Sequence, residues 1–165
     1  MLGHHAKFKA LSLENILTAS DGTRKNLLLI LKLKGKETVV IPCNRGRATI
    51  CVPSQVDCAM ICLFCYTRRQ GVKRYLSTAG IAERAVFAQH LLANEVFGIE
   101  TCTFQEMGEP LQNINSVLKA ANITVHDQGL HFSPRKVTVS TSGLVPQLKH
   151  FLHESNCALA VTTDD

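Results

Sequence analysis

The sequence predicts an α/β protein whose main sheet is parallel. From residue 78 onward, helical and β-rich segments alternate in the order helix, strand, helix, strand, helix, strand. Such alternation is typical of right-handed βαβ units, in which consecutive strands lie parallel and are joined by helices. The chain has 165 residues, of which 45% are hydrophobic and 19% charged, so it is long enough for one domain with a buried core.

The first 53 residues have a different pattern, typical of antiparallel strands. Residues 1–20 are weakly patterned, and the segment LSLENIL within them is compatible with a short helix or with the tail of a truncated element. In NLLLILKLKGKETVVIP, two β-rich runs flank Lys34-Gly35-Lys36, so a hairpin turn is expected there. Residues 47–53, RATICVP, predict a third strand. We therefore divide the chain into an N-terminal remnant (1–20), a β-hairpin extension (21–50) and a barrel core (51–165).

The core is predicted to contain three helices and three further strands. Thr78 is the expected N-cap of the first helix, in which apolar residues recur at helical spacing from Ile81 to Val96. A closed (β/α) barrel needs more strands than this, so the core is expected to be a partial (β/α) barrel with about four parallel strands. The later elements are a strand in 99–107, a helix over 113–124, a strand in 136–143, a helix in 144–154 and a strand in 157–163.

The net charge and the apolar segments of the sequence bear on the partners and the cellular location of the protein. The net charge of +5 suits a polyanionic partner, and it suits equally well a basic surface kept for solubility. The first ten residues lack the apolar segment of a signal peptide, and the longest apolar run is interrupted by Lys32. We expect a cytoplasmic monomer with no membrane partner. A plastid or mitochondrial location is the alternative if a transit peptide was removed.

Three cysteines lie within the eight residues CAMICLFC: Cys58, Cys62 and Cys65. One interpretation is that they are small core residues, and a second is a zinc site with Cys51 or another residue as fourth ligand. The third is a [4Fe–4S] cluster held by three thiolates, with one iron open to a cofactor. A C-x3-C-x2-C loop that follows a strand and precedes a βα series is the signature of radical S-adenosylmethionine (SAM) enzymes, which favours the third.

Several further blocks resemble, in the same order, those of the RlmN/Cfr group of radical SAM RNA methyltransferases. They are TRKNLLLILK, ATICVPSQVDCAMICLFC, RQGVKRYL, EMGEPLQN and RKVTVSTSGLVP, between Thr23 and Ala160. The resemblance implies methylation of an adenine ring carbon, C2 in RlmN-like enzymes, in large-subunit rRNA and in tRNA. It also implies that the core is a partial radical SAM (β/α) barrel, with a [4Fe–4S] cluster, SAM, and an electron donor such as flavodoxin or ferredoxin.

The resemblance assigns a SAM site by position. Gly108 and Glu109 would lie beside SAM, with Glu109 near its amino group, and a carboxylate does pair well with an ammonium. Ser140 would hydrogen-bond the ribose. Read from the residues alone, Gly-Glu-Pro is an ordinary turn and Ser140 a turn or cap hydroxyl. The family's last SAM-contacting segment corresponds here to Thr162, Thr163 and Asp164.

Two residues match distinctive positions of the family's mechanism. Cys51 would free the product from a covalent RNA–protein intermediate, and Glu37 would accept the proton from the adenine carbon. Without the resemblance, Cys51 is a half-buried strand residue and Glu37 a solvated charge. The family's methyl-carrying cysteine lies further downstream than Asp165, so we expect this chain alone to assemble a cluster and cleave SAM weakly, without completing turnover.

A basic loop follows the cysteines and is the expected RNA-facing surface, since phosphate contacts need cations. A solvated loop is the simpler interpretation. Departures from the family pattern occur at Asp57 (usually glycine), Gln105 and Glu106 (usually Met-Gly) and Asp164 (usually histidine). They leave two alternatives open: an RNA-binding relic without catalysis, and a zinc-binding structural module. The basic loop residues are Arg68, Arg69, Lys73 and Arg74.

Overall fold

The computed structural model is built around one mixed sheet with the strand order β1-β2-β3-β4-β7-β8-β9. Strands β4, β7, β8 and β9 run parallel to one another, which confirms the predicted parallel core. These strands are β4 (Arg47–Val52), β7 (Gly98–Phe104), β8 (Val137–Thr141) and β9 (Ala158–Val161). The structure describes residues 11–20, 23–30, 33–43, 47–60, 62, 65, 71–93, 98–105 and 108–162.

Three antiparallel strands precede the parallel ones. They are β1 (Leu11–Thr18), β2 (Arg24–Ile30) and β3 (Leu33–Cys43). Each pairs with the next, and β3 pairs antiparallel with β4, so the extension continues the same sheet. The register of β3 on β4 places Val39 opposite Cys51.

Two predictions for this region are wrong. The segment LSLENIL is a strand and not a helix, and its alternation is broken by a register shift between Leu13 and Asn15. Lys34-Gly35-Lys36 does not form the hairpin turn, because Ile30 pairs with Leu33 and all three residues therefore lie inside β3. A glycine between two lysines is usually a turn signal, but here the pairing of β3 with β2 outweighs that local preference.

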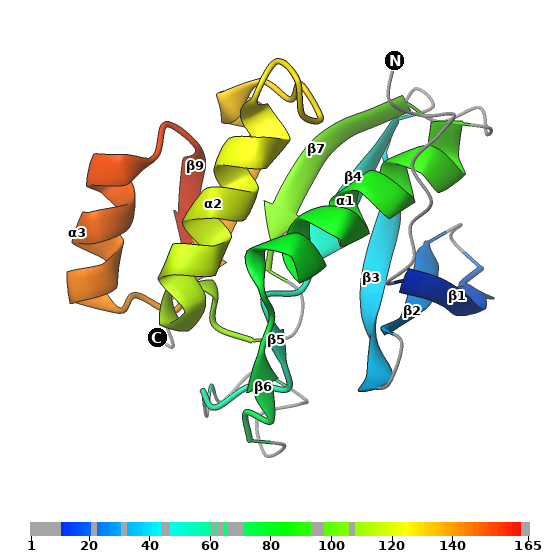
Figure 1. Ribbon diagram of the computed structural model, residues 1–165, viewed down its shortest axis with the longest axis horizontal. Coiled ribbons are helices and arrows are strands. Elements are labelled where there is room, and N and C mark those ends of the chain that lie inside the picture. Colours follow the sequence, from blue (N-terminus) through cyan, green and yellow to red (C-terminus); the bar gives the residue numbers. More distant parts are fainter. Residues whose placement is uncertain are drawn as a thin grey trace.

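Helices α1 (Thr78–Ala93), α2 (Ile114–Val125) and α3 (Val145–Glu154) cover one face of the sheet (Figure 1). The N-cap of α1 is Ser77 rather than the predicted Thr78, because the Gly80 N–H donates to Ser77 Oγ at 3.1 Å. Two 3-10 turns, Pro110–Asn113 and Pro134–Lys136, precede α2 and β8. Even α1, the longest of these helices at 16 residues, falls short of what a membrane-crossing helix requires.

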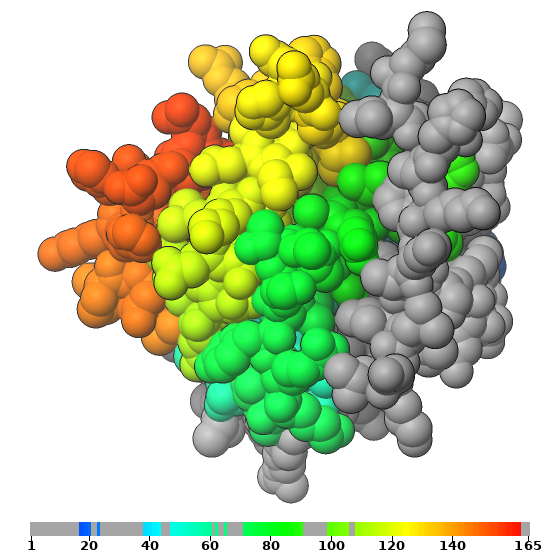
Figure 2. All heavy atoms as spheres, in the orientation of Figure 1, coloured from blue at the N-terminus to red at the C-terminus, as the bar shows by residue number. Residues whose placement is uncertain are grey.

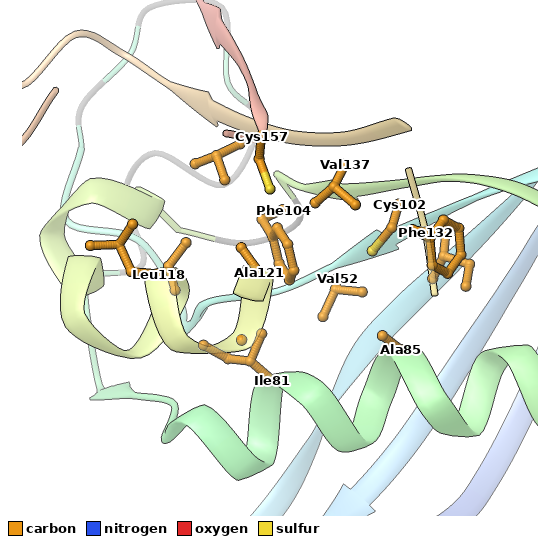
Figure 3. Close-up of a cluster of buried hydrophobic side chains, with 14 of the residues drawn as sticks. Val52, Ile81, Ala85, Cys102, Phe104, Leu118, Ala121, Phe132, Val137 and Cys157 are labelled. Carbon is orange, nitrogen blue, oxygen red and sulfur yellow. The ribbon is translucent and has the colours of Figure 1, made fainter. Parts of the chain in front are cut away.

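The main core lies between the sheet and the helices. Val52, Cys102, Phe104 and Val137 point from the strands toward Ile81, Ala85, Leu118 and Ala121 of α1 and α2 (Figure 3). In the coloured part of Figure 2 the side chains of the helices cover this face. Ile50 and Val52 belong to this core, so strand alternation turns Cys51 to the opposite face of the sheet. The core thus fixes which β4 side chains face the helices.

Candidate functional site

The cysteine loop begins and ends at a short antiparallel stem beyond the C-terminal end of β4. The stem consists of β5 (Gln55–Val56) and β6 (Arg74–Tyr75). The Lys73 N–H donates to the Val56 carbonyl at 2.9 Å, and the Leu76 N–H to the Ser54 carbonyl at 3.1 Å. Because the two ends of the loop are hydrogen-bonded to each other, the stem fixes the positions at which the cysteine loop begins and ends.

Asn113 joins this stem to the start of α2. Its Nδ2 donates to the carbonyls of Ser54 at 2.9 Å and Leu76 at 2.7 Å. Asn113 occupies the N-cap position of α2, yet its side chain makes no capping bond there. The side chain instead satisfies two backbone acceptors of the stem, which ties the cysteine loop to the loop that follows β7.

Cys58, Cys62 and Cys65 are half-buried and line one pocket of about 210 Å³. The Met60 N–H donates to Cys58 Sγ at 3.3 Å. Burial raises the pKa of the Cys58 thiol, the negative charges of Cys62, Cys65 and Glu109 raise it further, and the Met60 N–H opposes them. The thiolate form of Cys58 is therefore disfavoured unless a positively charged group binds in the pocket.

The three cysteines were expected to bind either a zinc ion or a [4Fe–4S] cluster. Across the described residues, no three His, Cys, Asp or Glu side chains form a group that could hold a metal ion. The three thiols share a pocket wall, however, and thiolates are the ligands that hold iron–sulfur clusters. In chemical type the three thiols therefore suit a [4Fe–4S] cluster, and Cys58, Cys62 and Cys65 are the residues that would hold it.

Glu109 is a buried pocket residue whose carboxylate accepts four hydrogen bonds. It is 3% exposed, and its Oε1 accepts from the Leu111 N–H at 2.8 Å and from Thr141 Oγ1 at 2.7 Å. Its Oε2 accepts from the Ser142 N–H at 2.8 Å and from Ser142 Oγ at 2.9 Å. One carboxylate thus ties the loop after β7 to the loop after β8, along the edge where a cofactor would lie.

Gly108 allows the chain to pass close to Gln55. Its φ is +117°, and a Cβ at this position would lie within 2.6 Å of the Gln55 Cβ. Gln55 is fully buried, its Oε1 accepts from the Glu109 N–H at 3.0 Å, and its Nε2 donates to Gln112 Oε1 at 3.2 Å. The glycine is therefore required both by its backbone conformation and by contact with the stem.

The remaining predicted SAM residues lie partly in the same pocket. Ser140, at the end of β8, and Thr162, after β9, both line it, and the Thr162 N–H donates to the Thr141 carbonyl at 2.9 Å. Gln105 lines the pocket as well. Glu106, Thr163 and Asp164 lie outside the described residues.

Cys51 and Glu37 lie on neighbouring strands. Cys51 is 8% exposed, and its register partners are Val39 on β3 and Thr103 on β7. Glu37 lies in β3 two positions before Val39, but its side chain is outside the described part of the structure. Cys51 is not among the residues that line the 210 Å³ pocket.

The predicted RNA-contact residues are described only in part. Arg68 and Arg69 fall outside the described residues, whereas Lys73 and Arg74 lie at the stem. Lys73 is exposed, and its Nζ lies 2.9 Å from Oδ2 of the buried Asp57. Part of its charge is thus already matched within the chain.

Several residues that build the site were missed by sequence reasoning. Gln55, Asn113, Thr141 and Ser142 each bridge two segments that are far apart in the chain. Their sequence signal is weak, because a single amide or hydroxyl near a strand end has many ordinary roles. Only the side-by-side placement of β4, β7 and β8 brings their partners within reach.

A mixed α/β sheet with a three-cysteine loop at the C-terminal ends of its parallel strands defines the radical SAM class. In agreement, the solved structure of a radical SAM methyltransferase from Sphaerobacter thermophilus matches this chain with a TM-score of 0.85 and 32% identity. The match covers 92% of this chain and 45% of that one. No protein-family model matches the chain.

Curated relatives point to one family within the radical SAM class. The dual-specificity RNA methyltransferase RlmN of Syntrophobacter fumaroxidans is 42% identical over 161 residues, which is 98% of this chain and 46% of the relative. The RlmN proteins of Alkalilimnicola ehrlichii (42%, covering 93% and 43%) and Geobacter sulfurreducens (39%, covering 97% and 44%) are similar. The chain is a homologue of the RlmN family of radical SAM RNA methyltransferases, and it spans less than half the length of these relatives.

Proposed function

We propose that this chain carries the cluster and SAM site of an RNA methyltransferase that methylates C2 of an adenine in large-subunit rRNA, and in tRNA. The observation that carries the proposal is the shared pocket of Cys58, Cys62, Cys65 and Glu109, in a chain 42% identical to a dual-specificity RNA methyltransferase. The C-terminal ends of parallel strands are where α/β folds place their ligands.

The three thiolates would hold a [4Fe–4S] cluster, and Ser140 and Thr162 would hydrogen-bond SAM. When bound, the cluster and SAM would supply one-electron chemistry that produces a hydrogen-abstracting radical. The four hydrogen bonds to Glu109 occupy both of its oxygens, so it would act on the SAM ammonium mainly through its charge. Its other role would be to hold the two loops at the pocket edge in place.

On the sheet, Glu37 would accept the proton from the adenine carbon and Cys51 would release the product. The pairing of β3 with β4 supports these roles, because Val39 lies opposite Cys51 and Glu37 is two positions before Val39 in β3. Cys51 is also held at the end of β4, one residue before its last position. These two roles require the remaining parts of the catalytic machinery, including a methyl-carrying cysteine.

The basic residues Arg68, Arg69, Lys73 and Arg74 would contact RNA phosphates. Affinity that depends on phosphate contacts falls as salt rises, with a slope set by the number of contacts. Replacing Arg74 should therefore weaken binding to a ribosomal RNA hairpin and make the salt dependence shallower. Equal slopes for wild type and Arg74→Ala would argue against this surface.

The experiment that tests the proposal is SAM cleavage by the anaerobically reconstituted chain. We expect slow formation of 5′-deoxyadenosine with a strong reductant, and none in Cys62→Ala. Zinc uptake without iron uptake would favour a structural module, and RNA binding without a cluster would favour a relic. Either result would contradict the proposal.

A further inference from the structure

Asp57, the residue before Cys58, combines an uncommon backbone conformation with deep burial. Its φ is +64°, in the left-handed region that few residues other than glycine, asparagine and aspartate adopt. It is only 2% exposed, although an aspartate is rarely this buried without an ionic partner. A buried carboxylate therefore stands immediately beside a candidate cluster ligand.

Lys73 reaches this carboxylate from the other end of the cysteine loop. Lys73 Nζ lies 2.9 Å from Asp57 Oδ2, and the Lys73 N–H donates to the Val56 carbonyl at 2.9 Å. One lysine thus makes a side-chain contact and a backbone contact with two consecutive residues. The loop of residues 58–72 is closed at its base by this pair.

The two members of the pair lie in different surroundings. The Lys73 side chain is 72% exposed, whereas that of Asp57 is 2% exposed. Removing Lys73 would take this cation away from a buried carboxylate, which is costly. Removing the charge of Asp57 would leave only a solvated ammonium, which is not.

We propose that Asp57 and Lys73 form a clasp that fixes the base of the cysteine loop and positions Cys58 before any metal binds. Both are positioning residues. The consequence for metal binding rests on the proposed cluster, but the clasp itself is a property of the metal-free chain. Because of the unequal burial, loss of Lys73 alone should disturb the loop more than loss of both charges.

Hydrogen exchange of the metal-free chain tests the clasp directly. In Lys73→Met, amides 54–60 should exchange about tenfold faster, the factor that corresponds to 1.4 kcal/mol. In Asp57→Asn/Lys73→Met they should return to within about threefold of wild type, since asparagine tolerates the same backbone region. Lys73→Arg should behave as wild type, and so should Lys119→Met, which removes an exposed lysine of α2. Unchanged exchange in α2 separates local opening from global unfolding.

A second measurement follows iron loss to a chelator after reconstitution. Lys73→Met should lose iron faster than the double variant. The clasp is overturned if Lys73→Met exchanges like wild type, or if the double variant exchanges at least as fast as the single one. If the wild type takes up no iron, the proposal of a cluster is wrong. The hydrogen-exchange rates of the metal-free variants still test whether the clasp exists.

Discussion

Ser142 and Glu109 are joined by two hydrogen bonds: the N–H and the Oγ of Ser142 both donate to Glu109 Oε2, at 2.8 and 2.9 Å. Their parent loops follow β7 and β8, which are neighbours in the sheet. The pocket edge therefore depends on a single buried carboxylate.

Glu109→Gln should lower the free energy of unfolding by about 3 kcal/mol, because an amide group would face donors that it cannot satisfy. Denaturant unfolding of the metal-free chain measures this. Glu154→Gln, at an exposed position on α3, is the matched control and should leave stability nearly unchanged. Equal stabilities of the two variants would show that the network around Glu109 contributes little.

Gly108→Ala should destabilise the chain by about 3 kcal/mol, since the new methyl group would meet Gln55 in addition to the cost of positive φ. Gly71→Ala is the control: its φ is +68°, and a Cβ there has nothing within 4 Å. That variant should lose only about 1 kcal/mol. If both variants lose the same stability, the contact with Gln55 is not limiting.

The parallel core could be predicted because each strand and helix from residue 78 onward has its own hydrophobic pattern and a short connection. The extension was harder. Its first strand has an irregular register, and Gly35 lies within a strand where it usually marks a turn. The cysteine loop was visible as a spacing. The bonds of Glu109 and Gln55 were not, since they arise only when distant strands become neighbours.

The cysteines should differ widely in alkylation rate, as measured by mass spectrometry of the metal-free chain. Exposed Cys43 should react first and fully buried Cys102 last, because burial strongly raises the pKa of Cys102. Burial also raises the pKa of Cys58, so at a given pH less of it is thiolate. Its rate should therefore keep rising about tenfold per pH unit beyond the point where an ordinary thiol levels off. An early plateau for Cys58 would contradict its described burial.

Arg84→Met should leave stability unchanged or raise it by about 1 kcal/mol. Arg84 is fully buried, and within the described part of the chain its Nε and Nη2 have no hydrogen-bond partner. Burial and the nearby positive charge of Arg74 lower its pKa to about 10. Arg135→Met, at an exposed position, controls for loss of charge. A loss of more than about 2 kcal/mol would mean that the Arg84 bond to the Gly80 carbonyl outweighs the burial of its charge.

The central claim is that Cys58, Cys62 and Cys65 hold an iron–sulfur cluster. Anaerobic reconstitution with iron and sulfide, followed by metal analysis and electron paramagnetic resonance of the reduced sample, tests it most directly. We predict about four irons per chain, the signal of a reduced [4Fe–4S] cluster that changes when SAM is added, and loss of both on replacing any one of the three cysteines. The account would be contradicted if the wild-type chain stayed iron-free. It would also be contradicted if the Cys58→Ala variant bound as much iron as the wild type.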